Sequence, residues 1–131
     1  MAREAAGAGM RRGALKVKRI YERPGPGDGL RVLVDRLWPR GLSKDEAATD
    51  LWLKEAAPSP MLRRWYGHDP RRWKRFKDKY RAELAGQPEV LELINDLRRR
   101  GPVTLLFAAH DEAQNNAVVL REVLDNEGEK R

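Results

Sequence analysis

The sequence predicts a single-domain, layered α/β fold in which helices cover a small, largely parallel sheet. Short apolar runs indicate strands, and longer segments with apolar residues every three or four positions indicate helices. The predicted order is strand, strand, three helices, strand, helix. This order favours parallel pairing of the second and last strands through a right-handed crossover. With 131 residues, the chain is long enough to bury one core.

Three segments are predicted to be strands, and a fourth is ambiguous. In 15–21, apolar and basic residues alternate, as in a half-buried strand. The second predicted strand is 30–37. The run 103–109 is apolar except for Thr104, which is typical of a strand covered on both faces. The segment 50–53 fits either a short strand or a helix.

Helix starts are marked by capping residues. Ser43, followed three residues later by Glu46, predicts a capping box, and Asp69-Pro70 predicts an N-cap followed by a first-turn proline. A turn of helix is expected from Pro60 to residue 65. The apolar stripes of the next helices predict their inward faces: Trp73, Phe76, Tyr80 and Leu84; Val90, Leu91, Ile94 and Leu97; Ala117, Leu120 and Leu124.

We expect residues 13–126 to form the domain, with 1–12 a disordered tail and 127–131 a frayed one. Residues 1–12 lack the apolar core of a secretory signal, and no apolar run is long enough to span a membrane. The chain has no cysteine, which fits a reducing compartment. We therefore expect a cytoplasmic protein with no membrane partner, and the sequence leaves its oligomeric state open.

The residue inventory excludes several kinds of site. Without cysteine there is no thiol nucleophile, and two serines and two histidines nearly exclude a Ser-His-Asp triad. The standard glycine-rich nucleotide loops are absent. The histidines and carboxylates show no metal-ligand spacing. We accordingly predict no metal and no cofactor.

The positive charge is concentrated in one segment. Residues 63–81 hold nine Lys and Arg against two Asp, an excess that equals the net charge of +7 of the whole chain. Arg72 and Arg75 are our binding candidates in this segment, with nucleic acid as the anionic partner. The other interpretation is an ordinary solvated helix face.

Polar residues follow two predicted strands that we expect to be neighbours. Asp35, Arg36, Trp38 and Arg40 follow the second strand. Ligands of open α/β sheets bind beyond the carboxyl ends of the strands, and arginines match phosphate or carboxylate oxygens. These residues therefore predict an anion site. Two interpretations stay open: an Asp35–Arg36 ion pair that only fixes the loop, and packing rather than base stacking for Trp38.

His110, Asp111, Asn115 and Asn116 follow the last strand and precede the last helix, whose free N–H groups would favour an anion. His110 and Asp35 are the candidate acid–base groups, and Asn115 and Asn116 are candidate binding residues. The alternatives are a structural role for His110, a helix N-cap for Asp111 and first-turn capping for the two asparagines. We regard His68 as a solvated loop residue.

Five strings carry a family resemblance: Val34-Asp-Arg-Leu-Trp-Pro-Arg-Gly41; Leu51-Trp-Leu-Lys54 with Ala57-Pro-Ser59; Trp73-x-x-Phe76-x-x-x-Tyr80-x-x-Glu-Leu84; Thr104-Leu-Leu-Phe-Ala-Ala109; and Asn116-Ala-Val-Val-Leu120. From about Leu15 to Leu124 the chain resembles the YeaO-like branch of a family built on a domain of unknown function. The resemblance implies a small cytosolic bacterial or archaeal α/β protein and no particular activity.

The resemblance also bears on the start of the last helix. Longer relatives carry Cys-His-Arg where this chain has Gln114-Asn115-Asn116, and YeaO-like members often have Asn-His-Ala where it has Asn115-Asn116-Ala117. If that histidine is catalytic in relatives, Asn116 puts the activity in doubt here.

Three hypotheses about function follow. The first is binding of a phosphate-containing ligand or nucleic acid by an arginine-lined pocket and the basic helix face. The second is a small enzyme that acts on an anionic substrate by acid–base or hydrolytic chemistry, with Asp35 or His110 as the proton-transfer group. The third is a structural or interaction module.

Overall fold

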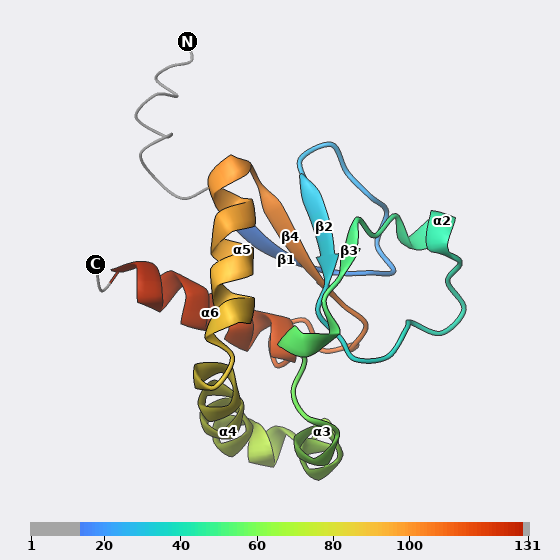
Figure 1. Ribbon diagram of the computed structural model, residues 1–131. Helices are drawn as coiled ribbons and strands as arrows, with labels where there is room; N and C mark the ends of the chain where they lie inside the picture. Colours follow the sequence, from blue (N-terminus) through green and yellow to red (C-terminus); the bar gives the residue numbers. More distant parts are fainter. Residues whose placement is uncertain (1–13, 130–131) are drawn as a thin grey trace.

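Four parallel strands form one sheet in the order β1-β4-β2-β3 in the computed structural model, which describes residues 14–129 (Figure 1). The strands are β1 (Leu15–Arg19), β2 (Leu30–Leu33), β3 (Leu51–Trp52) and β4 (Val103–Phe107). The predicted parallel pairing of the second and last strands is confirmed. The ambiguous segment 50–53 contains edge strand β3. The expected tail 1–12 lies outside the described residues, as do residues 130–131.

The two faces of the sheet carry different cores. From β4, Leu105 and Phe107 face the larger cluster, which includes the inward residues of the helices, whereas Leu106 faces a smaller one with Leu33 and Ile20. Every residue of β4 is buried, because the strand is central and covered on both faces. The α/β layer fold is therefore present as predicted.

The helices are α2 (Lys44–Ala47), α3 (Pro60–Tyr66), α4 (Trp73–Ala85), α5 (Pro88–Arg100) and α6 (Asn116–Glu129), with short 3-10 helices η1 (Lys54–Ala56) and η2 (Pro70–Arg72). The predicted capping box of Ser43 and the N-cap of Asp69 are both formed. The inward stripes of α4, α5 and α6 pack in the larger core. Tyr80, fully buried, ties α4 to η1 by donating its hydroxyl hydrogen to the Ala56 carbonyl.

β2 ends at Leu33, earlier than the predicted Leu37. The ladder continues for one step, as the Val34 amide donates to the Leu106 carbonyl at 3.1 Å. The Asp35 carboxylate then accepts from the Ala108 amide at 2.9 Å, in place of a further backbone carbonyl. A side chain thus ends the strand, and the following residues are released as a loop, where Leu37 is 59% exposed.

At the amino edge of the sheet, a buried ionic network fixes the loop before β2. The Asp28 carboxylate accepts from Lys18 Nζ at 3.1 Å, from Arg31 Nη1 at 2.6 Å and from the Gly25 amide at 3.0 Å. Burial by itself would raise the pKa of Asp28, but these hydrogen bonds lower it to about 2. The next residue, Gly29, has φ +64° and lies against the Pro102 backbone.

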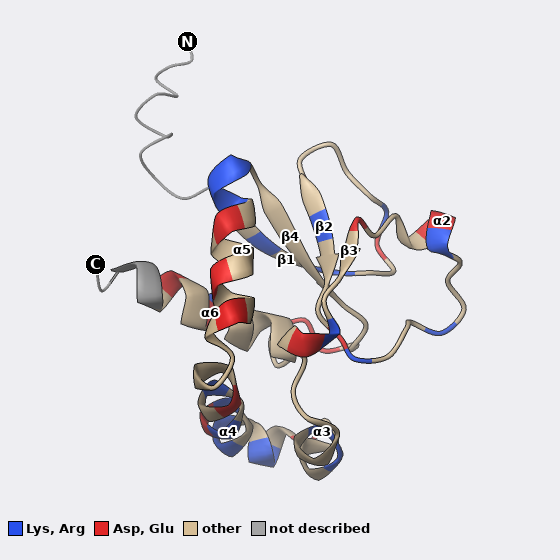
Figure 2. Cartoon of the chain, in the orientation of Figure 1, with Lys and Arg blue, Asp and Glu red and all other residues tan. Residues whose placement is uncertain are grey.

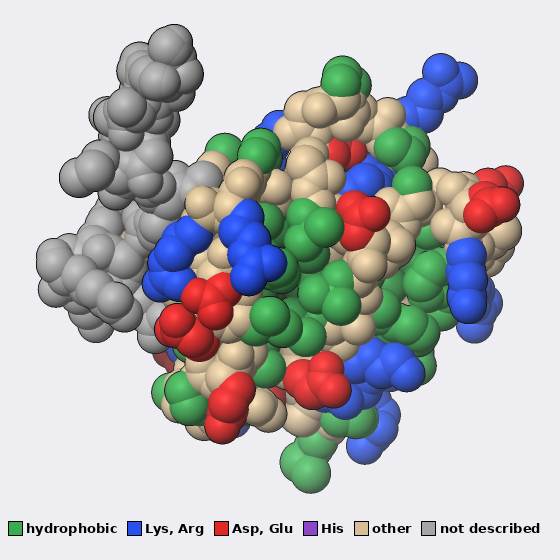
Figure 3. Space-filling model, turned by 45° about the horizontal axis from the view of Figure 1, so that its top comes forward, with side chains coloured by type: hydrophobic (Ala, Val, Ile, Leu, Met, Phe, Trp, Pro, Cys, Tyr) green, Lys and Arg blue, Asp and Glu red, His purple; other side chains and the backbone are tan. Residues whose placement is uncertain are grey.

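Charges are mixed on the face of the molecule shown in Figure 3. Acidic and basic side chains are interspersed there around a band of hydrophobic ones. Among the described residues, no helix combines the length and apolar character needed to cross a lipid bilayer.

Candidate functional site

A cavity of about 560 Å³ lies at the carboxyl edge of the sheet. Its walls come from the segments that follow β1, β2 and β4, and from α3 with the turn after it. The predicted convergence of two remote segments is present, because the residues after β2 and those at the start of α6 line the same hollow. Of the nine candidate residues, seven line it: Asp35, Arg36, Trp38, Arg40, His110, Asn115 and Asn116.

Asp35 connects three elements at the base of the cavity. One carboxylate oxygen accepts from the Ala108 amide after β4, and the other accepts from Asn116 Nδ2 of α6 at 3.2 Å. Asn116 Nδ2 also donates to the Val34 carbonyl at 3.0 Å. Burial raises the pKa of Asp35, while these two hydrogen bonds and the positive charges of Arg63 and His68 act in the opposite direction. Among the ion pairs of residues 14–129, none joins Asp35 to Arg36, so the structure does not support the alternative in which such a pair fixes the loop.

Three arginines line the cavity: Arg36, Arg40 and Arg63. Arg36 is half-buried, and its Nε is buried with no hydrogen-bond acceptor among the described residues. Arg40 and Arg63 are exposed and form no ion pair within residues 14–129. An unsatisfied buried donor costs about 1–3 kcal/mol. The wall of the cavity thus includes a guanidinium group with one N–H that has no acceptor among the described residues.

Trp38 has a structural role at the rim. Its indole N–H donates to the Leu42 carbonyl at 2.7 Å, and its ring meets Trp52 edge-on with centroids 5.3 Å apart. Trp52 in turn donates to the Asp35 carbonyl at 2.8 Å. Trp38 packs in the smaller core while lining the cavity, so the packing interpretation of this residue agrees with the structure.

The start of α6 differs from the alternative in which Asp111 caps the helix. Asn115 is the cap: its Oδ1 accepts from the Val118 amide at 3.0 Å, and its Nδ2 donates to the Asp111 carbonyl. Asp111 instead closes the preceding turn by accepting from the amides of residues 113 and 114. Asn115 is only 2% exposed and is committed to these bonds. His110 is exposed at the cavity wall.

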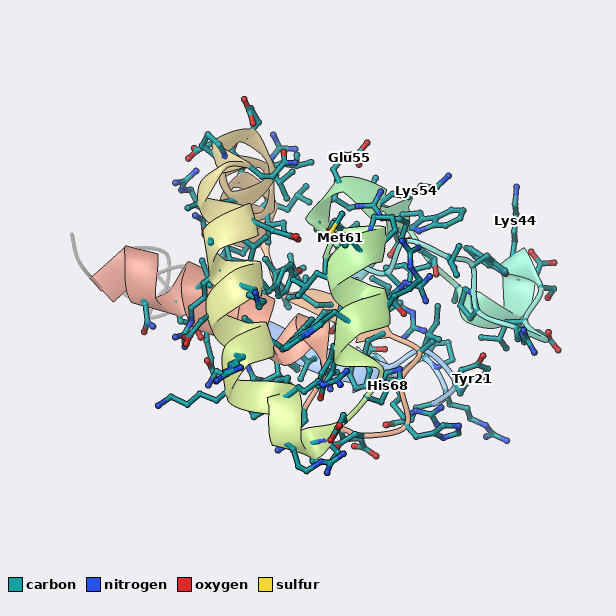
Figure 4. All side chains as sticks on the ribbon, turned by 90° about the horizontal axis from the view of Figure 1, so that it is seen from below. Tyr21, Lys44, Lys54, Glu55, Met61 and His68 are labelled. Atoms are coloured by element: carbon teal, nitrogen blue, oxygen red, sulfur yellow. The ribbon has the colours of Figure 1, made fainter. Side chains whose placement is uncertain are left out.

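Three aromatic or imidazole side chains at the cavity were missed by sequence reasoning. Tyr21 follows β1, so the strand-end signal that selected Asp35 could have found it; its hydroxyl donates to the Arg40 carbonyl at 2.9 Å. Tyr66 and His68 come from α3 and the turn after it, which no sequence signal places at this edge. Figure 4 shows His68 and Tyr21 toward the same end of α3. His68 is exposed, as expected of a loop residue, but it also lines the cavity.

Tyr66 closes one side of the cavity. Its hydroxyl donates to the Gln114 carbonyl at 3.2 Å, and its ring stacks on Phe76 with centroids 4.3 Å apart. Burial raises the pKa of Tyr66, and the charges of Asp111 and Asp69 raise it further. The phenol is therefore neutral at physiological pH and serves as a donor.

Arg72 and Arg75, the two remaining candidates, do not line the cavity. They belong to what we call the basic surface, the exposed cations of α3, η2 and α4 that do not pair with α6 (Figure 2): Arg63, Arg64, Arg71, Arg72, Lys74, Arg75 and Lys79. Asp69 pairs with Arg71 at 3.1 Å and with Arg72 at 3.9 Å. Lys77 and Arg81, also in the basic segment, pair with Glu122 of α6.

Within residues 14–129, no group of three or more His, Asp or Glu side chains is arranged to hold a metal ion. The cavity instead combines guanidinium, imidazole and amide donors with aromatic walls. Such a lining can hold an anionic group beside an apolar or ring-shaped one.

Comparison with known proteins places the chain in a family. Residues 14–131 match the family described as "Inactive DUF488-N3 subclade". The chain is 41% identical to an uncharacterised protein of Mycobacterium tuberculosis over 111 residues, and this alignment covers 85% of the chain and 93% of the relative. It is 39% identical over 110 residues to the uncharacterised protein YeaO of Escherichia coli, with 84% and 96% covered. No solved structure matches. The chain therefore belongs to the YeaO-like DUF488-N3 family, within the subclade described as inactive.

Proposed function

We propose that this protein binds a phosphate-bearing ligand in the cavity at the carboxyl edge of its sheet. The observation that carries the proposal is Arg36, which lines the cavity and whose buried Nε–H has no acceptor among the described residues. A phosphate group in the cavity would pair with the guanidinium of Arg36 and neutralise its charge. Charge-assisted bonds of this kind are among the strongest that a binding site makes.

The remaining charges favour the same ligand class. Three arginines line the cavity against two carboxylates, Asp35 and Asp111, before either histidine is protonated. Both Asp35 oxygens already accept hydrogen bonds from the protein, which reduces its repulsion of an incoming anion. The volume of about 560 Å³ falls within the range of small-molecule pockets, roughly 300–1,000 Å³.

Binding is favoured over catalysis by two observations. Asp35, the best-placed acid–base candidate, is bonded through both oxygens to groups that hold the fold together, so we give it a positioning role. His110, the other candidate, is exposed, and we give it a ligand-binding role. The family match is to a subclade described as inactive, which agrees with a binding protein.

Calorimetric titration with inorganic phosphate, pyrophosphate and AMP tests the proposal. We expect at least one of these probes to bind, and Arg36→Gln to weaken it by about tenfold to a hundredfold, the equivalent of one charged hydrogen bond. The matched control is Arg99→Gln, because Arg99 lies on α5, is paired with Asp96 and does not line the cavity. The proposal is wrong if none of the probes binds at millimolar concentration, or if Arg36→Gln binds them as tightly as the control.

The enzyme hypothesis is tested with the same proteins. Turnover of a phosphate ester that disappears in Asp35→Asn, while AMP binding is retained, would replace the binding proposal with a catalytic one. We expect no such turnover.

A further inference from the structure

The cavity and the basic surface meet at Arg63. This residue of α3 lines the cavity and also belongs to the basic surface, which continues through η2 to α4. The positive charge outside the cavity is therefore joined to the charge inside it. A ligand held only in the cavity would leave most of these cations without a partner.

Much of the basic surface is not neutralised by the protein itself. Within residues 14–129, Arg64, Lys74, Arg75 and Lys79 form no ion pair with a carboxylate. By contrast, the cations nearest α6, Lys77 and Arg81, are paired with Glu122. On α4, Arg75 and Lys79 lie on the side of the helix opposite Lys77, because successive residues are about 100° apart around the helix axis. Unpaired charges of one sign attract a polyanion.

An aromatic ring lies among these charges. Trp65 of α3 is half-buried, and the Arg72 guanidinium carbon and Lys79 Nζ each lie 5.3 Å from its ring centroid. Arg72 also donates to the Trp65 carbonyl, which holds η2 against α3. Both cations lie over the ring of this half-buried tryptophan. Proteins bind unpaired bases with aromatic rings set among basic side chains, so that a base stacks on a ring and the neighbouring phosphates meet the cations.

We propose that the ligand is a single-stranded nucleic acid whose terminal phosphate enters the cavity and whose backbone runs over the basic surface past Trp65. This inference rests on the proposed function, because the cavity must first accept a phosphate. A single strand is favoured over a duplex for two reasons. The cavity has the size of a small-molecule pocket, and stacking on Trp65 requires a base that is not already paired and stacked.

α3 sets the distance between the two halves of this site. Arg63 and Tyr66 line the cavity, whereas Trp65 meets Arg72 and Lys79 of the neighbouring elements. A strand that joins them has to cross one helix, about 10 Å in diameter. An oligomer of about eight nucleotides is long enough, since sites for single strands commonly span about 4–16 nucleotides.

Fluorescence anisotropy with labelled oligothymidylate of about eight nucleotides tests the inference. Four forms of this strand are compared: with a 5′ phosphate, with a 3′ phosphate, with no terminal phosphate, and as a duplex with its complement. We expect the single strand with one of the terminal phosphates to bind tightest and the duplex to bind more weakly. The double variant Arg75→Glu with Lys79→Glu should lose at least tenfold in affinity for the strand and keep its AMP affinity. Its salt dependence should fall by about 1.4 in log–log slope, because each single-strand phosphate contact contributes about 0.7.

The control is Arg99→Glu with Arg100→Glu, the same change of charge at two exposed residues of α5. Equal weakening by both double variants would overturn the inference, because the binding would then depend only on net charge. Equal affinity for duplex and single strand, or for ends with and without phosphate, would also overturn it. If AMP binds but the strand binds no more tightly than AMP, this inference fails while the proposed function stands. If neither the strand nor any of the three small probes binds, both fail.

Trp65→Phe supplies a second readout in a protein that should still fold. Quenching of tryptophan fluorescence by the strand should decrease in this variant. Unchanged quenching would count against stacking at this ring.

Discussion

Asn116 fastens α6 to the end of β2, so its replacement should destabilise the protein by a measurable amount. In Asn116→Ala, the Val34 carbonyl loses a neutral hydrogen bond and Asp35 loses a bond to its charged form. A neutral bond contributes about 0.5–1.5 kcal/mol and a charged one about 1.5–3 kcal/mol. Because Asp35 borders the cavity, water can replace part of the second bond. We therefore expect a loss of about 2 kcal/mol in the free energy of unfolding.

Asn116→Asp makes the same site sensitive to pH. The new carboxyl group would lie beside Asp35, whose pKa is already raised by burial, and the like charge would raise it further. A carboxyl group with a raised native pKa binds its proton more tightly in the folded state, so stability falls as the pH rises above the unfolded value of 3.8. Asn116→Asp should thus be less stable than Asn116→Ala at pH 7 and should recover toward it at pH 4.

Urea unfolding monitored by tryptophan fluorescence at both pH values measures these differences. Asn126→Ala is the control, because Asn126 is exposed on the same helix. The reasoning is refuted if Asn116→Ala loses no more stability than this control, or if Asn116→Asp is equally stable at both pH values.

Three further predictions concern the fold. The pKa of Asp28 is about 2 in the folded protein and 3.8 in the unfolded chain, so the stability that Asp28 contributes is present above pH 4 and is lost toward pH 2. The difference in unfolding free energy between wild type and Asp28→Asn should therefore shrink between pH 4 and pH 2. Gly29→Ala should prevent folding or lower the free energy of unfolding by several kcal/mol, because the new Cβ would lie 2.1 Å from the Pro102 carbonyl oxygen. The control Gly41→Ala also has a positive φ, +77°, but faces open space, so it should cost only the left-handed strain of about 1–2 kcal/mol. A thermal melt compares the two variants. Tyr80→Phe should lose about 1–3 kcal/mol in urea unfolding, because a buried carbonyl keeps no donor; an unchanged midpoint would contradict this bond.

Sequence reasoning succeeded where local pattern decides the outcome. The alternation in β1, the continuous apolar run of β4 and the inward stripes of α4, α5 and α6 agree with the structure, because burial of a face imposes the period of the element. It was less accurate where a side chain replaces backbone pairing. Asp35 accepts from Ala108 and ends β2 early, and Asn115 rather than Asp111 caps α6.

The candidate site shows the same division. Residues that follow strands could be assigned to the carboxyl edge, since parallel strands deliver their exits to one side. Arg63, Tyr66 and His68 could not, because they reach the cavity through the packing of α3. Nor could the sequence show that Lys77 and Arg81 are neutralised by Glu122, about forty residues away on another helix.

The amino-acid sequence by itself determined the layered α/β class, the parallel pairing of β2 with β4 and the concentration of positive charge in one segment, because periodicity and composition are local quantities. Tertiary structure decided which charges stay unpaired and how α3 walls the cavity. These outcomes depend on distances between segments remote in the chain, and no local pattern encodes them.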